Sequence, residues 1–359
     1  TGVQTCALPI SRIIHVFLWK TQQARRSVFK KTAIAVAGLY YSEGTMASTN
    51  RKGVFQLTKY VVKRILLAIV TILIVCGITF FAMNAIPGGP FDGEKAVSPE
   101  VKAALEKRYN LDKPIPEQFV IYMNNLLHGD FGISTKTGRD IKTLIFESFR
   151  VSAKLGGMAI LVALALGLVF GSLAALTRNK LPDRLIIFFS TLFTSLPSFV
   201  FATLLLLVFC VQLKWIPVWD ANHQNYILPV IALAAYPMAY ITRLTKTSML
   251  DVMGQDYVRT ARAKGVARWK VIFKHTLRNA LIPVITYVGP MTASILTGSL
   301  VVEKIFTIGG LGAKFVDGIT NRDYPMIMGT TIFLAVLMVT MNLVTDIVYK
   351  LVDPRIKLD

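Results

Sequence analysis

The residues with the most pronounced chemical pattern lie in a polar segment, residues 251–282, enclosed by two long apolar runs. From Arg243 to Arg278 the chain carries nine lysines and arginines against two acidic residues, Asp251 and Asp256. A basic, amphipathic segment of this kind binds anionic lipid or docks onto a partner protein. We call residues 251–282 the basic loop.

Two short helices are predicted within the basic loop. The spacing of Val258, Ala261 and Arg262 predicts a helix that ends at Gly265, because glycine readily adopts the left-handed conformation that closes a helix. The second predicted helix has an apolar face formed by Trp269, Ile272, Phe273, Leu277 and Ala280, and a basic face formed by Lys270, Lys274 and Arg278. The chain is then expected to re-enter the membrane at Pro283.

Other residue patterns argue against nucleotide binding, metal binding and catalysis by this chain. Gly309–Lys314 is the nearest approach to a phosphate-binding loop, but it lacks the required spacing and is followed by Phe315. The four histidines and three cysteines are scattered, so the sequence predicts no metal site, disulfide framework, cofactor or catalytic group. Glu303 and Asp346 lie near the ends of apolar runs, where Asp346 is placed to pair with Lys350. The apolar runs thus lack, near their centres, the acidic groups that an ion-coupled carrier would use.

The composition predicts an all-α integral membrane protein. Of 359 residues, 53% are hydrophobic and 17% are charged, which is more apolar surface than one soluble core accommodates. The net charge of +20 does not indicate nucleic-acid binding, because the basic residues sit beside apolar runs and not on one polar face.

Six membrane spans are predicted, at about residues 60–84, 152–177, 185–213, 226–249, 280–303 and 324–350. The positive-inside rule places both termini and the basic loop in the cytoplasm. Residues 87–147 then form an extracytoplasmic segment, with one short helix opened by Ser98 and Pro99 and a second at 117–127 that stops at Gly129.

Residues 1–45 differ from the rest of the chain. Their two short apolar patches are too short to span a membrane, and the opening TGVQTCALPISR resembles translated adapter sequence. We therefore interpret 1–45 as a non-native or disordered extension before Met46, with a mitochondrial-type presequence as the alternative.

Several uncharged polar residues in the apolar runs are candidates to line a transport path or to bond neighbouring helices: Ser195, Ser198, Tyr236, Tyr240, Thr286 and Tyr287. Small residues in the fifth run, among them Gly289 and Ala293, are expected to let helices approach closely. The prolines inside the runs predict kinks, or hinges along the path.

The basic loop resembles the cytoplasmic EAA loop of ABC-transporter permeases. Arg259, Thr260 and Ala261 stand at the Glu-Ala-Ala positions and Gly265 at the glycine, while His275 to Arg278 stand where the family has Ile-x-Leu-Pro. YVRTARAKG followed by FKHTLRNALIPV resembles the variant of the peptide-transporting branch, as do IPGGPFDGE, HGDFG, NRDY and DPRIK elsewhere. The resemblance implies an ATPase-coupling role for Asp256, Arg259, Thr260, Ala261, Lys264, Gly265, His275, Leu277 and Arg278.

The same resemblance, over residues 57–359, implies the type I ABC importer permease fold in a bacterial inner membrane. The expected partners are a second homologous permease, two ATPase subunits that use ATP, and an extracytoplasmic peptide-binding protein. Oligopeptides are the expected cargo, with dipeptides, glutathione or nickel as alternatives. An ion-coupled carrier or channel is the alternative from another class, and an intramembrane enzyme is disfavoured because no span pairs a nucleophile with a base.

Overall fold

The computed structural model describes residues 51–85, 91, 100, 104, 106–107, 109–220 and 223–352. The chain divides into two units, Thr1–Val62 with Leu358–Asp359, and Lys63–Lys357. The described part of the first unit is the beginning of one helix, and everything below concerns the second. The extension 1–45 and most of the helix expected from Ser98 lie outside the described residues.

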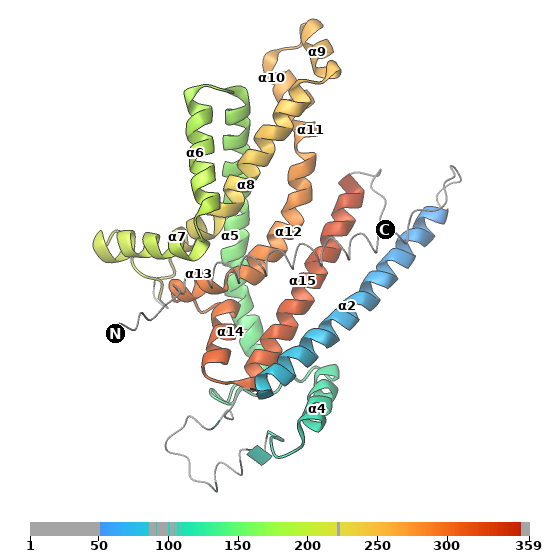
Figure 1. Ribbon diagram of the computed structural model, residues 1–359, viewed down its shortest axis with the longest axis vertical. Helices are drawn as coiled ribbons and strands as arrows, with labels where there is room; N and C mark the ends of the chain where they lie inside the picture. The colour runs from blue at the N-terminus through green and yellow to red at the C-terminus, as the bar shows by residue number, and fades with distance from the viewer. Residues whose placement is uncertain are drawn as a thin grey trace, which may run out of the picture. The chain divides into compact units, whose positions relative to one another are not determined.

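The described residues form helices and one isolated β-bridge, between Ile133 and Asp140. In chain order the helices are α2 (Arg51–Ala85), α4 (Ile115–Leu127), α5 (Ile141–Leu176), α6 (Leu181–Ser195), α7 (Ser198–Leu205), the π-helix η1 (Leu206–Gln212), α8 (Ile227–Met253), α9 (Asp256–Ala263), α10 (Arg268–Lys270), the π-helix η2 (Val271–Leu277), α11 (Arg278–Ala280), α12 (Ile282–Gly298), α13 (Leu300–Ile305), α14 (Leu311–Thr320) and α15 (Tyr324–Val352). Figure 1 shows α4 and α14 at one end of the unit and α9 to α11 at the other. We call these the α4 end and the α9 end.

Among the described residues, five helical stretches are long and apolar enough to cross a membrane, in α2, α5, α8, α12 with α13, and α15. A sixth crossing is possible only if α6 and α7 with η1 count as one span, and these are bent by 104°. The third span expected at 185–213 thus contains a sharp bend at Pro197, one of the prolines at which the sequence predicts a kink or hinge.

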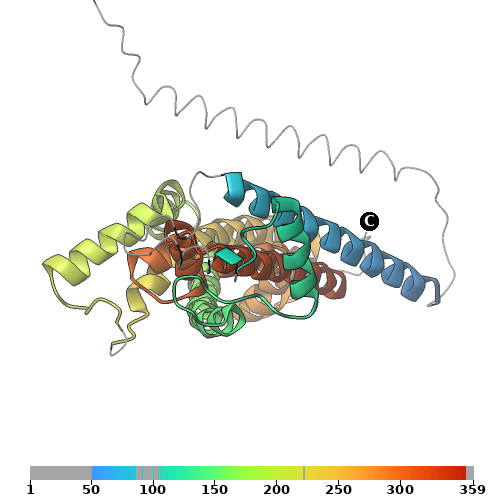
Figure 2. The same ribbon diagram turned by 90° about the horizontal axis from the view of Figure 1, so that it is seen from below.

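Pro197 explains this bend. Proline has no backbone N–H and disfavours helical geometry in the residue before it. Leu196 is accordingly extended, with ψ of 129°, and Pro197 itself has ψ of 135°. The chain leaves α6 at this point and runs sideways as α7, which Figure 2 shows projecting away from α5 and α8.

The centre of the unit is the contact between α5 and α8, with α6 alongside (Figure 1). Small residues recur every fourth position on one side of α5, and all of them are buried: Ala159, Ala163, Gly167, Gly171 and Ala175. A Cβ at Gly171 would lie 2.6 Å from the Thr242 carbonyl oxygen, so the backbones touch where α5 lacks side chains. Close approach of this kind is typical of helix packing in membranes.

The expectation about small residues in the fifth run is confirmed. A Cβ at Gly289 in α12 would lie 2.0 Å from the Thr345 hydroxyl of α15, and Ala293 is buried. Gly289 therefore lets α12 and α15 pack directly together.

At the α4 end, α2 and α4 pack against the start of α15. Cys76 and Phe80 of α2 and Met328 of α15 are buried in one cluster, which the Phe119 ring of α4 joins at 5.3 Å from the Phe80 ring centroid. Many other apolar side chains of α2, such as Leu66 and Ile78, are exposed in this chain. In a membrane protein that face meets lipid or another membrane subunit.

Helix α5 begins at Ile141, eleven residues before the predicted start of the second span at 152. Asp140 caps the helix, since its carboxylate accepts hydrogen bonds of 2.8 Å from the backbone N–H and from the hydroxyl of Thr143. Ile141 and Ile145 are then buried against Leu311. This first stretch of α5 is too polar to read as a span, although it belongs to the same helix.

The cap predicts a pH-dependent start of α5. The bonds from Thr143 hold the pKa of Asp140 below its ordinary value of 3.8. The stabilisation is therefore complete above that value and is lost as the pH falls through the lower folded-state pKa. We expect Asp140→Ala to cost about 1 kcal/mol and to speed amide hydrogen exchange in the first turn about fivefold at neutral pH.

Asp140→Asn is the matched control, because an asparagine oxygen caps without a titrating charge. It is expected to retain the protection of the wild type at neutral pH and to keep it in acid, whereas the wild type approaches the alanine variant. Equal exchange in the two variants at neutral pH would show that the cap contributes nothing.

Candidate functional site

The basic loop forms a short helix, a tight turn and a second helix, as predicted. Helix α9 ends in a Schellman motif, in which the Gly265 N–H bonds the Arg262 carbonyl at 3.0 Å and the Val266 N–H bonds the Ala261 carbonyl at 3.2 Å. Gly265 has φ of 73°, the left-handed conformation that glycine adopts without strain. We call this turn, residues 264–267, the knuckle.

A small apolar core holds the knuckle in place. Val258, Ala261 and Val271 are buried together, and Val266 packs against them. The neighbouring cluster joins Ala280 and Met249 to Ala175 at the end of α5. The knuckle is therefore tied to α5 and α8 through packing, so that a force applied to α9 reaches the long helices.

The predicted coupling residues divide into two groups by exposure. Ala261 is buried and His275 and Leu277 are half-buried, and these hold the loop together. The exposed group consists of Asp256, Arg259, Thr260, Lys264, Gly265 and Arg278. Asp256 and Arg259 form a weak exposed ion pair, with 3.7 Å between nitrogen and oxygen. The exposed group is the part of the loop that a partner can reach.

The apolar face predicted for the second helix is only partly correct. Ile272, Leu277 and Ala280 pack inward, but Trp269 and Phe273 are 61% and 63% exposed. The physical reason is the π-helix η2, whose i→i+5 bonding alters the 3.6-residue spacing on which the prediction rested. Two aromatic rings therefore stand beside the basic residues, free to insert into lipid or a partner.

Charged groups missed by the sequence reasoning brace the α9 end. The Lys246 ammonium of α8 lies 2.5 Å from the Asp183 carboxylate of α6, and the Asn179 N–H bonds the same carboxylate at 2.9 Å. Asp183 is buried, so this pair fixes the turn between α5 and α6 against α8. Asp346 contacts Arg64 of α2 at 3.0 Å, a partner that the predicted Lys350 pairing did not include.

The six candidate path-lining residues do not all lie together in the structure. The rings of Tyr240 on α8 and Tyr287 on α12 lie 4.3 Å apart, so the structure brings these two together. Tyr236 is 49% exposed on α8, and the Thr286 hydroxyl bonds the Ile282 carbonyl of its own helix. Ser195 and Ser198 are exposed on either side of the α6–α7 bend, with no hydrogen bond to these tyrosines in the described part of the chain.

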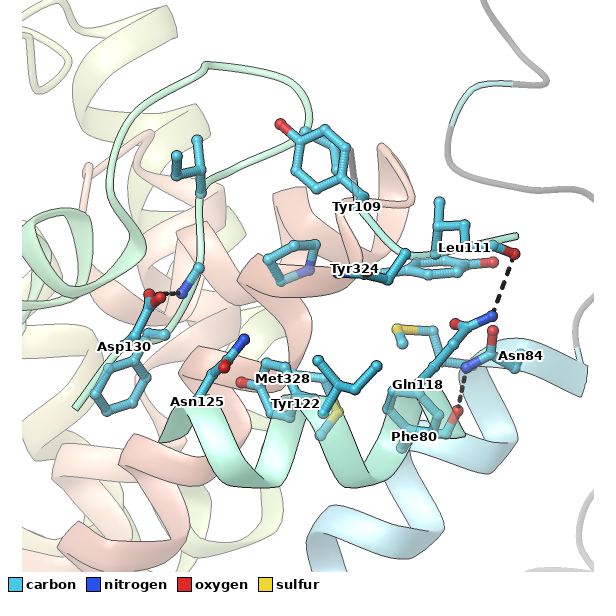
Figure 3. A pocket seen from close by; sticks show the side chains of 18 of the residues that line it. Phe80, Asn84, Tyr109, Leu111, Gln118, Tyr122, Asn125, Asp130, Tyr324 and Met328 are labelled. Carbon is cyan, nitrogen blue, oxygen red and sulfur yellow. Dashed lines mark hydrogen bonds between the residues drawn. The ribbon is translucent and has the colours of Figure 1, made fainter. Parts of the chain in front are cut away.

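A cavity of about 490 Å³ opens at the α4 end (Figure 3). Its walls come from α2, α4, the segment 109–140 and the start of α15, and they combine aromatic rings with the amides of Asn84, Gln118 and Asn125. The Tyr122 hydroxyl is buried there without a hydrogen-bond partner among the described residues, and burial raises the pKa of this phenol. The phenol is therefore neutral and can donate to a guest.

Asp323 anchors one wall of this cavity. Its carboxylate accepts hydrogen bonds from the Ser134 hydroxyl and, at 3.2 Å, from the Thr135 N–H, while it also faces the Met326 N–H in the first turn of α15. Asp323 is buried, and the bonds join the segment after α4 to α15. The motif containing Asp323, NRDY, thus has a structural role at the α4 end.

The glycine-rich segment before α14 holds an internal carboxylate. Glu303 is fully buried, and its oxygens accept from the Ser299 hydroxyl at 2.6 Å and from the Ala313 N–H at 3.1 Å. A Cβ at Gly310 would lie 2.4 Å from Glu303, which explains the glycine. The helix N-terminus that would bind a phosphate therefore already binds Glu303. No group of three or more His, Cys, Asp or Glu able to hold a metal occurs among the described residues.

Comparison with known proteins shows the family. Residues 167–358 match the binding-protein-dependent transport system inner membrane component, and residues 57–151 match the N-terminal membrane component of that system. The dipeptide transport system permease protein of Bacillus subtilis is 46% identical over 84% of this chain and 99% of its own length. The oligopeptide transport system permease protein of Haemophilus influenzae is 42% identical over 83% and 99%.

One solved chain, of the methionine ABC transporter MetNI in an inward-facing conformation, aligns with a TM-score of 0.48 and 16% identity, over 59% of this chain and 97% of its own. At the level of the family, the matched proteins are transport permeases and not enzymes. The chain belongs to the binding-protein-dependent inner membrane components, in the branch that contains the permease proteins of dipeptide and oligopeptide ABC importers.

Proposed function

We propose that this chain is the transmembrane permease subunit of an ABC importer that moves oligopeptides across the bacterial cytoplasmic membrane. The observation that carries the proposal is the basic loop, a rigid exposed knuckle inserted between two apolar helices and packed onto α5 and α8. Together with relatives that are peptide permease proteins, this arrangement supports coupling to a partner at Gly265.

The proposed topology places the α9 end in the cytoplasm and the α4 end outside. The positive charges gathered in the basic loop support this orientation. In the complex we propose, the knuckle docks on one of two ATPase subunits, a second permease packs beside α2, and a binding protein delivers peptide at the α4 end. Closure of the ATPases would then move α8 and α12 as rigid bodies.

The cargo has two candidates. The stretch IPGGPFDGE of this chain, which resembles oligopeptide permeases, and the 42% identical relative from Haemophilus influenzae both favour oligopeptides. The 46% identical dipeptide permease of Bacillus subtilis favours dipeptides. ATP-driven uptake of labelled dipeptides and pentapeptides by proteoliposomes containing the whole complex separates the two. Uptake of dipeptides alone would refute the oligopeptide assignment.

A pair of cysteine variants tests orientation and coupling together. Lys264→Cys lies on the knuckle, and Thr137→Cys lies in the exposed segment at the α4 end. We expect a short bifunctional reagent to cross-link the first cysteine to an ATPase subunit. A membrane-impermeant maleimide should label only the second cysteine in intact cells. The opposite labelling pattern, or a complex with no ATPase contact at Lys264→Cys, would refute the proposal.

A further inference from the structure

A second recess, of about 480 Å³, lies at the α9 end between the last turn of α5 and the knuckle. Leu176 of α5, Met253 of α8, Val266 and Ile272 form apolar walls. Arg262 and Arg268 line the same recess from the two sides of the knuckle. Figure 1 shows α9 extending past the end of α5.

Neither arginine has a partner among the residues that the structure describes. No ion pair or hydrogen bond from either guanidinium occurs among the described residues, and none of the residues lining the recess is acidic. Asp256, an acidic residue of the basic loop, pairs with Arg259 instead. The recess therefore combines two uncompensated positive charges with apolar walls.

Helix electrostatics accounts for one of these arginines and not for the other. Arg262 lies in the last turn of α9, where a cation is favourable. Arg268 opens the three-residue helix α10, so it lacks the helix C-terminus that favours the charge of Arg262. A bound anion would compensate both charges and would join the two sides of the knuckle through one ligand.

The position of the recess indicates the source of that anion. It contains Leu176, the last residue of α5, so it lies beside the end of a helix that is long and apolar enough to cross a membrane. The exposed aromatic rings of Trp269 and Phe273 in the same loop are typical of that interface. The planar fork of arginine fits phosphate oxygens with two parallel hydrogen bonds.

We propose that this recess binds the phosphate headgroup of an anionic phospholipid, with Arg262 and Arg268 as its ligands and the apolar walls against the glycerol and upper acyl chains. The lipid braces the knuckle against α5. The two lipid ligands flank the knuckle but differ from Lys264 and Gly265, which are proposed to contact the ATPase, and the first test does not require transport.

The test measures phosphatidylglycerol retained by the complete complex after extraction from mixed phosphatidylglycerol and phosphatidylcholine vesicles, using native mass spectrometry. Arg262→Gln with Arg268→Gln is expected to reduce retention about thirtyfold, and each single change about fivefold. Lys270→Gln with Lys274→Gln is the matched control, since it removes the same charge from the same loop outside the recess, and is expected to retain lipid as the wild type does. Circular dichroism should show the same helix content in all variants.

Each remaining outcome is informative. Arg262→Lys with Arg268→Lys keeps the charge but loses the fork, and is expected to fall between wild type and the glutamine variant. Unchanged lipid retention in the glutamine variant would refute the site. If that variant also loses ATPase subunits, the arginines belong to the ATPase contact instead.

Displacement of the lipid by inorganic phosphate at equal concentration would assign the recess to a free anion. A second experiment measures peptide-coupled ATP hydrolysis with and without phosphatidylglycerol, and the lipid is expected to raise it in the wild type only. This experiment rests on the proposed function, so a negative result there leaves the lipid-retention result standing.

Discussion

Replacing Gly265 with proline is expected to abolish coupled uptake by the complex while ATP hydrolysis continues. Gly265 has φ of 73°, whereas proline fixes φ near −65° and has no N–H to bond the Arg262 carbonyl. Forcing this change costs about 3 kcal/mol or more, which would depopulate the knuckle on the order of a hundredfold. In the proline variant, peptide uptake should therefore be lost while phosphate release continues, both measured on the same proteoliposomes.

Two further substitutions at Gly265 show whether the backbone conformation is the cause. No heavy atom lies within 4 Å of a Cβ added at Gly265, so alanine meets only the left-handed strain of about 1–2 kcal/mol and should lower uptake about five- to thirtyfold. Asparagine tolerates this conformation and should transport close to the wild-type rate. Equal uptake in the alanine, asparagine and proline variants would contradict a role for the turn.

The second large effect is expected where α5 touches α8. A Cβ at Gly171 would lie 2.6 Å from both the Thr242 carbonyl oxygen and the Thr245 Cβ. Valine at this position must push the two helices apart, which we expect to cost about 3 kcal/mol, at the upper end of overpacking penalties. The purified chain should lose several degrees of melting temperature and much of its monodisperse fraction in size-exclusion chromatography.

The control is another glycine on the same helix. Nothing lies within 4 Å of a Cβ at Gly157, so Gly157→Val should change stability by less than about 0.5 kcal/mol. If both variants melt together, general intolerance of valine in α5 and not the contact with α8 is responsible. If neither is destabilised, the backbone contact described here is incorrect.

These two predictions differ in how visible their glycines are in the sequence. Gly265 follows a polar, basic stretch with helical spacing, so its turn could be predicted locally, and the Schellman bonds confirm it. Gly167 and Gly171 lie in an apolar run, where the local sequence does not indicate that a glycine is required. The signal for this contact is the repeat of small residues at every fourth position from Ala159 to Ala175, which only the packing against α8 explains.

Local composition determines much of this protein without any tertiary information. Apolar run length establishes that helices cross a membrane, because unsatisfied backbone groups cannot remain in hydrocarbon. The positions of helix-capping residues, of the left-handed Gly265 and of the helix-breaking Pro197 are also local, since each depends on the conformations open to one residue and its neighbours.

Tertiary structure alone decided how these parts are joined. The pairing of Asp183 with Lys246 connects residues 63 positions apart, and the burial of Glu303 depends on α13 meeting the start of α14. The outward turn of Trp269 and Phe273 depends on a π-helix that no 3.6-residue pattern reveals. The recess exists only because the knuckle lies beside the end of α5. Arg262 and Arg268, which the sequence places among the other basic residues of the loop, therefore line the same recess. Such contacts depend on distance in space, which residue spacing along a chain does not encode.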